Sequence, residues 1–312
     1  MKRPVWIDTD CGVDDAMALL CACALKDIEI VGVSAGVGTT SQENTFRNTR
    51  NVLALAGRKD IPVYPGSKTA WIEPYMPAPA FHGEDGLGGT VIPESDAPVE
   101  TEYAWDAIYE AAKKYEGELT VVTVGALTDL ATAIVKYPDL PKYIKEVDIM
   151  GGAIDGGNTT MASEANIRRD PHAAQCLFKS GIPVVMFGLD VTEQVRLTPA
   201  DREEIFRKNT SVTRLMEESI QIPLSTNLRQ GLDTYTLHDV CPVLYLSKPE
   251  LFEGKKAAVY VETQSPLTMG KTISDVYALT DDKFPDKNTL VMLKADREKA
   301  VSFFKELMLS YE

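Results

Sequence analysis

Residues 5–20 read V-W-I-D-T-D-C-G-V-D-D-A-M-A-L-L and place four aspartates between an apolar strand and an apolar helix. The apolar run Val5-Trp6-Ile7 is typical of a short buried strand. The Ala-, Leu- and Met-rich segment 16–25 is typical of a buried helix. The carboxylates are therefore expected on the turn that joins strand to helix. In open α/β sheets, ligands bind at this edge.

The aspartates of this turn are Asp8, Asp10, Asp14 and Asp15. Such close carboxylates repel one another unless a cation neutralises them or protons are taken up. Oxygen ligands in this number suit a hard divalent cation, Ca²⁺ or Mg²⁺. Helix capping is a simpler interpretation of Asp14 and Asp15. Capping does not account for Asp8 and Asp10 at the strand end, so we favour a metal or catalytic site.

The composition of the 312-residue chain, with 44% hydrophobic and 25% charged residues, is ordinary for a globular protein. Its net charge of −14 argues against nucleic acid as a partner, because phosphate binding needs clustered Lys and Arg. No apolar run in the sequence reaches membrane-spanning length, and the first strand begins too near Met1 for a signal peptide. Five cysteines without C-x-x-C spacing favour reduced thiols. We therefore expect a cytoplasmic protein without a membrane partner.

Strands and helices alternate through the first two-thirds of the chain, which predicts a mostly parallel, Rossmann-like open sheet with helices on both faces. The sequence contains no low-complexity linker and no internal repeat, so we expect one α/β domain over residues 1–312. A polar loop is expected at 225–237. Further strands are expected at 28–37, 61–64, 119–124, 147–150, 183–187, 257–262 and 289–293, and further helices at 41–56, 101–115, 128–136, 171–180, 199–208, 212–222, 240–246 and 295–311.

Two of the three histidines lie in or beside segments that could carry chemistry. Residues 65–98 are a long Pro- and Gly-rich segment that contains His82, and such long loops are usually functional or mobile. His238 precedes Asp239 at the start of a predicted helix, where Asp239 could simply be a cap. A histidine with a pKa near neutrality is also a natural proton donor to a leaving group.

The Gly-rich segment 151–171 follows a predicted strand and contains Asn158, Glu164 and Asn166. Side chains of these types hydrogen-bond hydroxyl groups well. A solvated loop would have a similar composition, so composition alone leaves both interpretations open.

Five blocks of the sequence, in order, resemble motifs of the inosine–uridine-preferring nucleoside hydrolases. D-T-D-C-G-V-D-D resembles D-x-D-P-G-x-D-D, and H-G-E-D-G-L-G resembles H-G-x-x-G-(L/M)-G. V-G-A-L-T-D-L-A is similar to G-x-L-T-N-(L/I)-A, and M-G-G-A…G-N…E-A-N-I…D-P-H-A-A to M-G-G…G-N…E-F-N-x…D-P-E-A-A. The late H-D also matches. The resemblance covers most of the chain and is far more specific than a lone D-x-D.

The resemblance implies an open α/β enzyme that cleaves the N-glycosidic bond of ribonucleosides with water, in purine or pyrimidine salvage. It implies a tightly bound Ca²⁺ and a homotetramer or homodimer. It assigns Asp10, Asp15 and Asp239 to Ca²⁺ through carboxylates, with Asp8 close by as a ligand or a structural residue. The main-chain carbonyl of Val124 would be a further ligand.

Further roles follow from the same resemblance. Asp10 would act as general base on a Ca²⁺-bound water. Asp14 would hold the ribose 2′-hydroxyl and Asp239 the 3′-hydroxyl, while Asn158 and Glu164 would bind the 5′-hydroxyl. Such a ring of oxygens would stabilise the positive charge of an oxocarbenium-like transition state.

The remaining roles concern the ring and the base. Asn166 would face the sugar ring, His82 would line the pocket, and His238 would protonate or hydrogen-bond the departing base. A histidine before the last metal aspartate resembles members that accept both purine and pyrimidine nucleosides, so pyrimidine or broad specificity is expected.

Two residues depart from the family pattern. Cys11 stands where the fingerprint has Pro, and Thr39 stands where the family typically has Asn beside metal and ribose. Thr39 favours one alternative, a weakly active or non-catalytic protein that binds ribose or nucleosides. Another alternative is an aspartyl phosphohydrolase with Asp281-Asp282 as its second acidic pair, which would leave the other four blocks unexplained.

Overall fold

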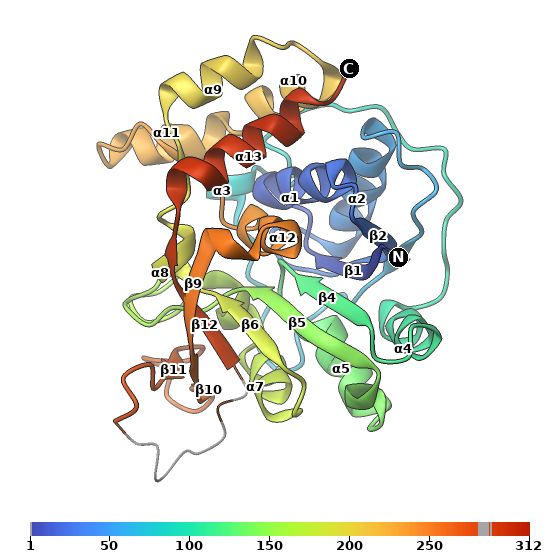
Figure 1. The fold of residues 1–312 in the computed structure, drawn as a ribbon, viewed down its shortest axis with the longest axis vertical. Coiled ribbons are helices and arrows are strands. Elements are labelled where there is room, and N and C mark those ends of the chain that lie inside the picture. Colours follow the sequence, from blue (N-terminus) through green and yellow to red (C-terminus); the bar gives the residue numbers. More distant parts are fainter. Residues whose placement is uncertain (1, 280–286, 288) are drawn as a thin grey trace.

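The computed structural model describes residues 2–279, 287 and 289–312, and an eight-stranded sheet runs through its centre (Figure 1). Neighbouring strands are parallel, except that the last one, β9, runs antiparallel to β12. The expected open, mostly parallel α/β sheet is therefore confirmed. In spatial order the strands are β3 (Val63–Pro65), β2 (Ile28–Ala35), β1 (Arg3–Thr9), β4 (Leu119–Thr123), β5 (Ile144–Met150), β6 (Val184–Phe187), β12 (Thr289–Ala295) and β9 (Phe252–Ala257).

Helices cover both faces of the sheet (Figure 1). The apolar layer on one face includes residues of α1 (Val13–Ala24), α2 (Gln42–Leu55), α9 (Pro199–Phe206), α10 (Ser211–Ser219), α12 (Val240–Ser247) and α13 (Arg297–Leu309). The other face packs against α4 (Ala104–Lys114), α5 (Thr128–Lys136) and α7 (Pro171–Lys179). Shorter elements are α3 (Pro79–His82), α6 (Ala165–Arg169), α8 (Leu189–Thr192), α11 (Gln221–Arg229), the 3₁₀ turns at 140–142 and 249–251, and the antiparallel pairs β7 (Arg196–Leu197) with β8 (Tyr235–Thr236) and β10 (Val259–Val261) with β11 (Thr272–Ser274).

Most of the predicted elements are present with ends shifted by a few residues, but the region 212–237 differs. The predicted helix 212–222 ends at Ser219, and a second helix, α11, begins at Gln221. The prediction of a loop was therefore wrong for residues 225–229. Pro223 lies in the first turn of α11, where its missing N–H leaves no hydrogen bond unmade. The pair Asp281-Asp282 lies outside the described residues.

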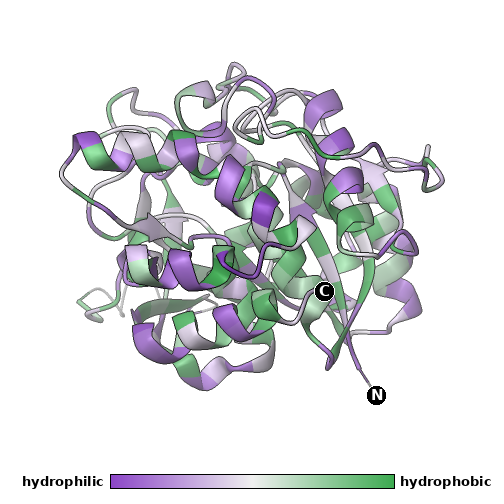
Figure 2. Cartoon of the chain, turned by 90° about the horizontal axis from the view of Figure 1, so that it is seen from above, coloured by the Kyte–Doolittle hydropathy of each residue, from purple (hydrophilic) through white to green (hydrophobic). Residues whose placement is uncertain are grey.

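The central strand β1 contributes to both apolar layers because its side chains alternate. Val5 and Ile7 face the layer under α1 and α12, whereas Trp6 faces the layer under α4 and α5. Gly32 on β2 lies opposite Trp6, and a Cβ at that position would come within 2.4 Å of the indole ring. Glycine is therefore required there. Figure 2 shows the hydrophobic residues gathered inside and the hydrophilic ones on the outer turns of the helices.

The order of the strands places a ligand crevice at the centre of the sheet. From β1 the chain winds outward through β2 and β3, then returns to the other side of β1 for β4, β5 and β6. The winding direction changes between β1 and β4. Ligands in such sheets bind beyond the carboxyl ends of the strands at this switch point. The four N-terminal aspartates follow or end β1, so the fold positions them at this crevice.

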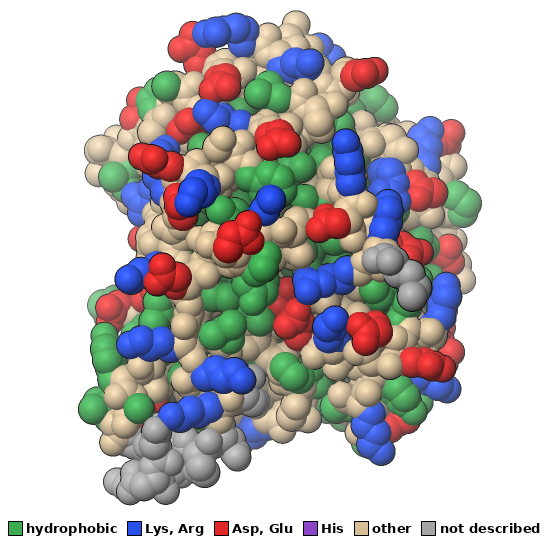
Figure 3. All heavy atoms as spheres, viewed as in Figure 1, with side chains coloured by type: hydrophobic (Ala, Val, Ile, Leu, Met, Phe, Trp, Pro, Cys, Tyr) green, Lys and Arg blue, Asp and Glu red, His purple; other side chains and the backbone are tan. Residues whose placement is uncertain are grey.

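Charged side chains of both signs are interspersed on the face shown in Figure 3, without a continuous basic stripe. This distribution gives that face no footprint for a phosphate backbone. Within the described parts of the chain, none of the helices combines the length and apolar character that crossing a bilayer requires.

One buried carboxyl lies away from the crevice. Asp148 on β5 is fully buried between Val122 of β4 and Val185 of β6, and neither of its oxygens has a hydrogen-bond partner among the described residues. Burial raises its pKa well above the usual value; Glu146 raises it further and Arg3 lowers it. Folding thus favours the protonated acid. The protonated Asp148 side chain makes its full contribution to the free energy of unfolding below the pKa of the unfolded chain. This contribution is lost as the pH rises through the raised pKa of the folded state.

We predict that Asp148→Asn raises the free energy of unfolding relative to wild type at pH 8 by about 1–3 kcal/mol. The gain should shrink toward pH 4, where the wild-type acid is protonated. Urea unfolding between pH 4 and pH 8 measures the difference. Glu146→Gln on the same strand is the control, and it should change stability by about 1 kcal/mol or less. If the free energy of unfolding changed with pH in the same way in wild type and in Asp148→Asn, the raised pKa of Asp148 would be contradicted.

Candidate active site

A cavity of about 510 Å³ opens at the carboxyl ends of the central strands. Its volume falls in the range of small-molecule binding sites. Of the residues predicted for the site, all except Asp8 line this cavity. They are Asp10, Asp14, Asp15, Thr39, His82, Val124, Asn158, Glu164, Asn166, His238 and Asp239.

Three carboxylates in the cavity are close enough to share one cation. Oxygens of Asp14, Asp15 and Asp239 all lie within 4.8 Å of one another. Burial raises the pKa of Asp15 and of Asp239 well above the usual value, and the neighbouring aspartates raise both further. Buried like charges of this kind favour binding of a divalent cation. The donor set therefore fits a hard metal ion. We name these three residues the carboxylate trio.

Asp15 both caps the helix α1 and belongs to the carboxylate trio. Its two oxygens accept hydrogen bonds from the N–H of Gly12 at 2.9 Å, the N–H of Asp10 at 3.2 Å and the hydroxyl of Thr9. These bonds close the N-terminus of α1 and fix the carboxylate in place. Asp239 is the N-cap residue of α12. Two helix N-termini thus meet at the trio, and their partial positive charge offsets part of the repulsion.

Asp10 lies beside the trio but has different partners. Its Oδ2 accepts a hydrogen bond from the N–H of Thr39 at 2.5 Å and lies 3.1 Å from Nη1 of Arg169. The Thr39 hydroxyl donates to the Asp10 main-chain carbonyl. A Cβ at Gly38 would come within 1.9 Å of Asp10 Oδ2, so only glycine leaves room for the carboxylate. Thr39, a departure from the family pattern, thus contacts Asp10 twice.

Asp8 and Val124 lie at the base of the crevice. Asp8 accepts a hydrogen bond from the Ser34 hydroxyl, and its other oxygen has no partner among the described residues. Burial and then the charge of Asp129 raise the pKa of Asp8. The Val124 carbonyl accepts a hydrogen bond from the Asn166 amide at 2.9 Å. A carbonyl oxygen has two lone pairs, so one stays available toward the cavity.

The opposite wall is formed by the loop and short helix after β5. Glu164 caps α6: its carboxylate accepts hydrogen bonds from the N–H groups of Gly152, Asn166 and Ile167 at 3.0, 2.8 and 3.1 Å. Burial raises its pKa above the usual value. Asn158 lies on the exposed rim, where its Oδ1 accepts a hydrogen bond from the N–H of Ala165.

Both histidines of the cavity are fixed through Nδ1. His82 Nδ1 accepts a hydrogen bond from the N–H of Val13 at 3.1 Å and lies 3.9 Å from an Asp14 oxygen. His238 Nδ1 lies 2.8 Å from the hydroxyl oxygen of Thr192. Burial lowers the pKa of both rings, which favours neutral imidazoles at neutral pH.

Several lining residues were not predicted from the sequence. Arg169 follows Asn166 by three positions, and this spacing places both on one face of α6. The composition of residues 151–171 leaves a solvated loop and a binding segment equally open, so it does not indicate this helical spacing. The outer wall is polar and comes partly from the region predicted as a loop; it includes Glu193, Arg196, Asn227, Gln230, Thr234 and Tyr235.

The sequence also matches a family model directly. The model described as inosine-uridine preferring nucleoside hydrolase covers residues 5–302. The chain belongs to this family. The predicted family and the predicted enzyme class, a nucleoside hydrolase, are confirmed, and the aspartyl phosphohydrolase alternative finds no support.

Relatives in this family align over the whole chain. The chain is similar to the pyrimidine-specific ribonucleoside hydrolase RihA of Klebsiella pneumoniae subsp. pneumoniae (36% identity) and to that of Photobacterium profundum (35% identity), with all of each chain covered. Among solved structures, a plant nucleoside hydrolase, the PpNRh1 enzyme, superposes with a TM-score of 0.93 at 28% identity over both complete chains. A purine-preferring ribonucleoside hydrolase from Gardnerella vaginalis gives 0.91 at 31% identity over 98% of each chain.

We predict that an excess of Ca²⁺ or Mg²⁺ raises the melting temperature at pH 8 by about 5 °C or more, because the cation relieves repulsion in the folded state. The increase should fade as the pH falls through the raised pKa values of Asp15 and Asp239, since protonated carboxyls do not bind metal. Differential scanning calorimetry measures both effects. Asp239→Asn should remove most of the increase, whereas Asp155→Asn, at an exposed residue that does not line the cavity, should keep it. An unchanged increase in Asp239→Asn would refute the trio as the site.

Proposed function

We propose that this protein hydrolyses the N-glycosidic bond of ribonucleosides to ribose and free base, with Ca²⁺ as cofactor and pyrimidine nucleosides preferred. One observation carries the proposal. The carboxylate trio lies in the same cavity as Asp10, Glu164 and Asn166. A cluster that fits a metal ion and a set of oxygens suited to binding ribose hydroxyls therefore line the same cavity.

The proposed metal ligands are Asp15, Asp239 and the Val124 carbonyl, with Asp14 within reach of the same ion. A bound Ca²⁺ would supply a positive charge that orients ribose hydroxyls and lowers the pKa of a water molecule. Asp8 is assigned a structural role, because its carboxylate is held by Ser34 and does not line the cavity.

The proposed sugar contacts are Asp14 with the 2′-hydroxyl, Asp239 with the 3′-hydroxyl, and Asn158 and Glu164 with the 5′-hydroxyl. Glu164 supports this role because three backbone N–H groups hold its carboxylate in one orientation. Asp10 is the proposed general base.

The proposed partner of the sugar ring is Asn166, whose amide donates to the Val124 and Met150 carbonyls and leaves its oxygen toward Arg169. Carboxylate and amide oxygens around the ring would stabilise the cationic transition state.

His238 is the proposed partner of the departing base, and His82 a lining residue. If the Thr192 hydroxyl donates to His238 Nδ1, the ring proton lies on Nε2 and can be donated. The lowered pKa favours hydrogen-bond donation from a neutral ring over transfer from an imidazolium at neutral pH.

The preference for pyrimidines is proposed from relatives at 35–36% identity whose names carry that specificity. Asn227 and Gln230 on the outer wall support it, because amides can pair with the polar edge of a pyrimidine. The purine-preferring neighbour at 31% identity makes broad specificity the second expectation.

The assembly and the compartment are proposed from the family resemblance, the exposed apolar side chains and the free cysteines. The family resemblance implies a homodimer or homotetramer, and the exposed side chains of Trp71, Ile72 and Phe81 offer apolar surface to such an assembly. The five free cysteines fit a reducing cytoplasm. Light scattering after size exclusion measures the assembly.

A second candidate function is a ribose- or nucleoside-binding homologue with little turnover. The contact between Arg169 and Asp10 favours it, because a guanidinium beside the sugar opposes a developing positive charge. A reducing-sugar assay on uridine, cytidine and inosine, before and after chelation, separates the two. Chelator-sensitive ribose release supports the hydrolase. The absence of release from any nucleoside, with a Ca²⁺-dependent stabilisation by ribose, supports the binding protein.

We predict that Asp10→Ala lowers kcat for uridine by about 10²–10⁴-fold, the usual range for loss of a general base. Circular dichroism of the variant provides the folding control. Wild-type rates of ribose release in Asp10→Ala would refute the role of Asp10.

We predict that kcat/KM for uridine exceeds that for 2′-deoxyuridine by up to about 10⁴-fold, because the missing hydroxyl leaves the Asp14 carboxylate without its partner in the bound complex. Asp14→Ala should reduce this ratio strongly. Equal rates with both nucleosides in wild type would refute the assignment of Asp14.

We predict that His238→Ala reduces kcat by about 10²-fold or more. The ratio of wild-type to variant rates should stay constant between pH 7 and pH 9, because the wild-type ring is already neutral there. A ratio that falls steadily as the pH rises through this interval would instead identify an imidazolium acid.

A further inference from the structure

The loop between β5 and α6 carries one of the proposed contacts to the 5′-hydroxyl, Asn158, in a stretch that is mostly exposed. Residues 155–161 form this stretch, and Asn158 and Gly157 line the main cavity. Exposed loop segments with few apolar contacts open easily. The position of Asn158 therefore depends on the polar contacts at the base of the loop.

Lys271 binds three carbonyl groups of this loop. Its Nζ donates to the carbonyls of Ala153, Ile154 and Gly156 at 3.1, 2.6 and 3.4 Å. An ammonium group has three N–H donors, so these carbonyls can use its full donor capacity. Hydrogen bonds from a charged donor are also stronger than neutral ones. The last of the three carbonyls lies two positions before Asn158.

Thr272, the next residue, holds the base of the same loop. Its hydroxyl accepts a hydrogen bond from the N–H of Ala153 and donates one to the Ala153 carbonyl, both at 2.8 Å. A Cβ at Gly152, whose φ is +82°, would come within 2.9 Å of the Thr272 methyl group. Glycine thus lets the chain pass this close. Both residues belong to the hairpin of β10 and β11, and we name Lys271 and Thr272 the hairpin pair.

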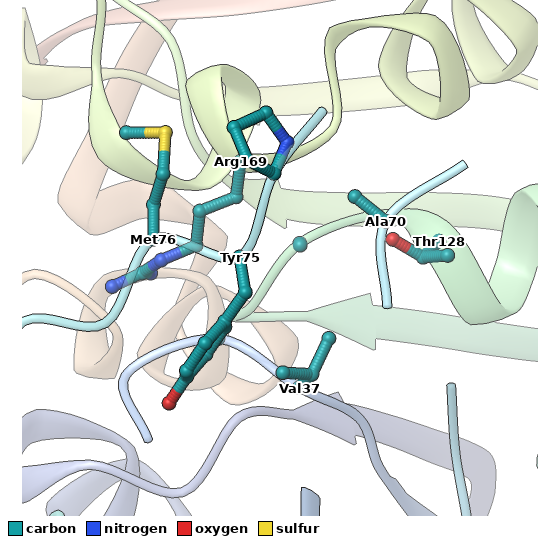
Figure 4. Close-up of a pocket in the computed structure, with 9 residues that line it drawn as sticks. Val37, Ala70, Tyr75, Met76, Thr128 and Arg169 are labelled. Carbon is teal, nitrogen blue, oxygen red and sulfur yellow. The ribbon is translucent and has the colours of Figure 1, made fainter. Parts of the chain in front are cut away.

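The helix α6, which follows the loop, has contacts that do not involve the hairpin pair. Arg169 lies beside Tyr75 and Met76 at a small cavity of about 10 Å³ (Figure 4). Three backbone N–H groups hold the Glu164 carboxylate at the start of the helix. Loss of a contact from the hairpin pair should therefore leave α6 in place and release mainly the stretch that carries Asn158.

We propose that Lys271 and Thr272 are positioning residues for the 5′ end of the site: they anchor the loop so that Asn158 meets the 5′-hydroxyl of ribose. The hairpin pair thereby sets the preference for nucleosides that carry this hydroxyl. A small misplacement of a binding group is costly, and a site built to bind a hydroxyl rejects analogues without it. This inference rests on the proposed function, in which Asn158 and Glu164 bind the 5′-hydroxyl.

Release of uracil from uridine and from 5′-deoxyuridine tests the proposal, and the ratio of the two kcat/KM values measures the preference. Lys271→Met removes the three donors and keeps an unbranched stem. It should lower kcat/KM for uridine by about tenfold and leave that for 5′-deoxyuridine within about twofold of wild type. Lys271→Arg retains a cationic donor and should keep at least about a third of the preference.

The control is Lys256→Met on the exposed part of β9, which makes the same change of charge and should alter neither rate. Thr272→Val supplies an independent test if Lys271→Met does not fold. It removes the hydroxyl at similar volume and should lower the preference in the same direction, whereas Thr272→Ser should keep it. Circular dichroism of each variant provides the folding control.

Equal losses with both nucleosides in the folded variants would show a general structural role and overturn the proposal, and so would an unchanged preference. If wild type releases no uracil but binds uridine more tightly than 5′-deoxyuridine in isothermal titration, the proposed hydrolysis alone is refuted. The ratio of the two dissociation constants then tests the hairpin pair in the same variants. Release of uracil by wild type without any preference for uridine would overturn this proposal and the 5′-hydroxyl contacts, but not the hydrolysis.

Discussion

Repulsion among buried carboxylates at the end of β1 is the constraint on which the rest of the site depends. Each carboxylate has a different compensating partner. Asp15 accepts hydrogen bonds at the N-terminus of α1, and Asp239 lies at the N-terminus of α12. Asp10 contacts Arg169 and the backbone of Thr39, and Asp8 accepts a hydrogen bond from the Ser34 hydroxyl. The raised pKa values of Asp8, Asp15 and Asp239 indicate that these partners compensate the charge only in part.

The sheet and most of the cavity could be predicted from the sequence because their signals are local. The alternation of β-branched runs with helical segments predicts parallel strands, and strand ends that carry Asp or Asn converge at one edge of such a sheet. The distances between these side chains could not be predicted. Asp14 joins Asp15 and Asp239, whereas Asp10 contacts Arg169, because of contacts between residues that lie 29 to 225 positions apart in the sequence.

One wrong prediction and one missed site residue have physical causes that the local sequence pattern does not show. The polar segment after Ile220 resembles a loop by composition, yet α11 forms there and packs against α3 beside the cavity. Arg169 was not predicted for the site, because nothing in the local pattern marks it as buried, yet the Asp10 carboxylate provides a buried partner for it. In both cases tertiary contacts outweigh local composition. The capping interpretation of Asp15, set against a metal site at first, describes hydrogen bonds that coexist with the trio.

The carboxylate trio joins α1, which begins at residue 13, to α12, which begins at residue 240, and these two helices pack against each other. A cation bound there would close a loop of more than two hundred residues. The site is complete only after three-quarters of the chain has been synthesised, so metal binding would report late assembly of the native state rather than its first steps. The ion would then act as a reversible cross-link between two helices on one face of the sheet, in a protein whose described cysteines are all free thiols.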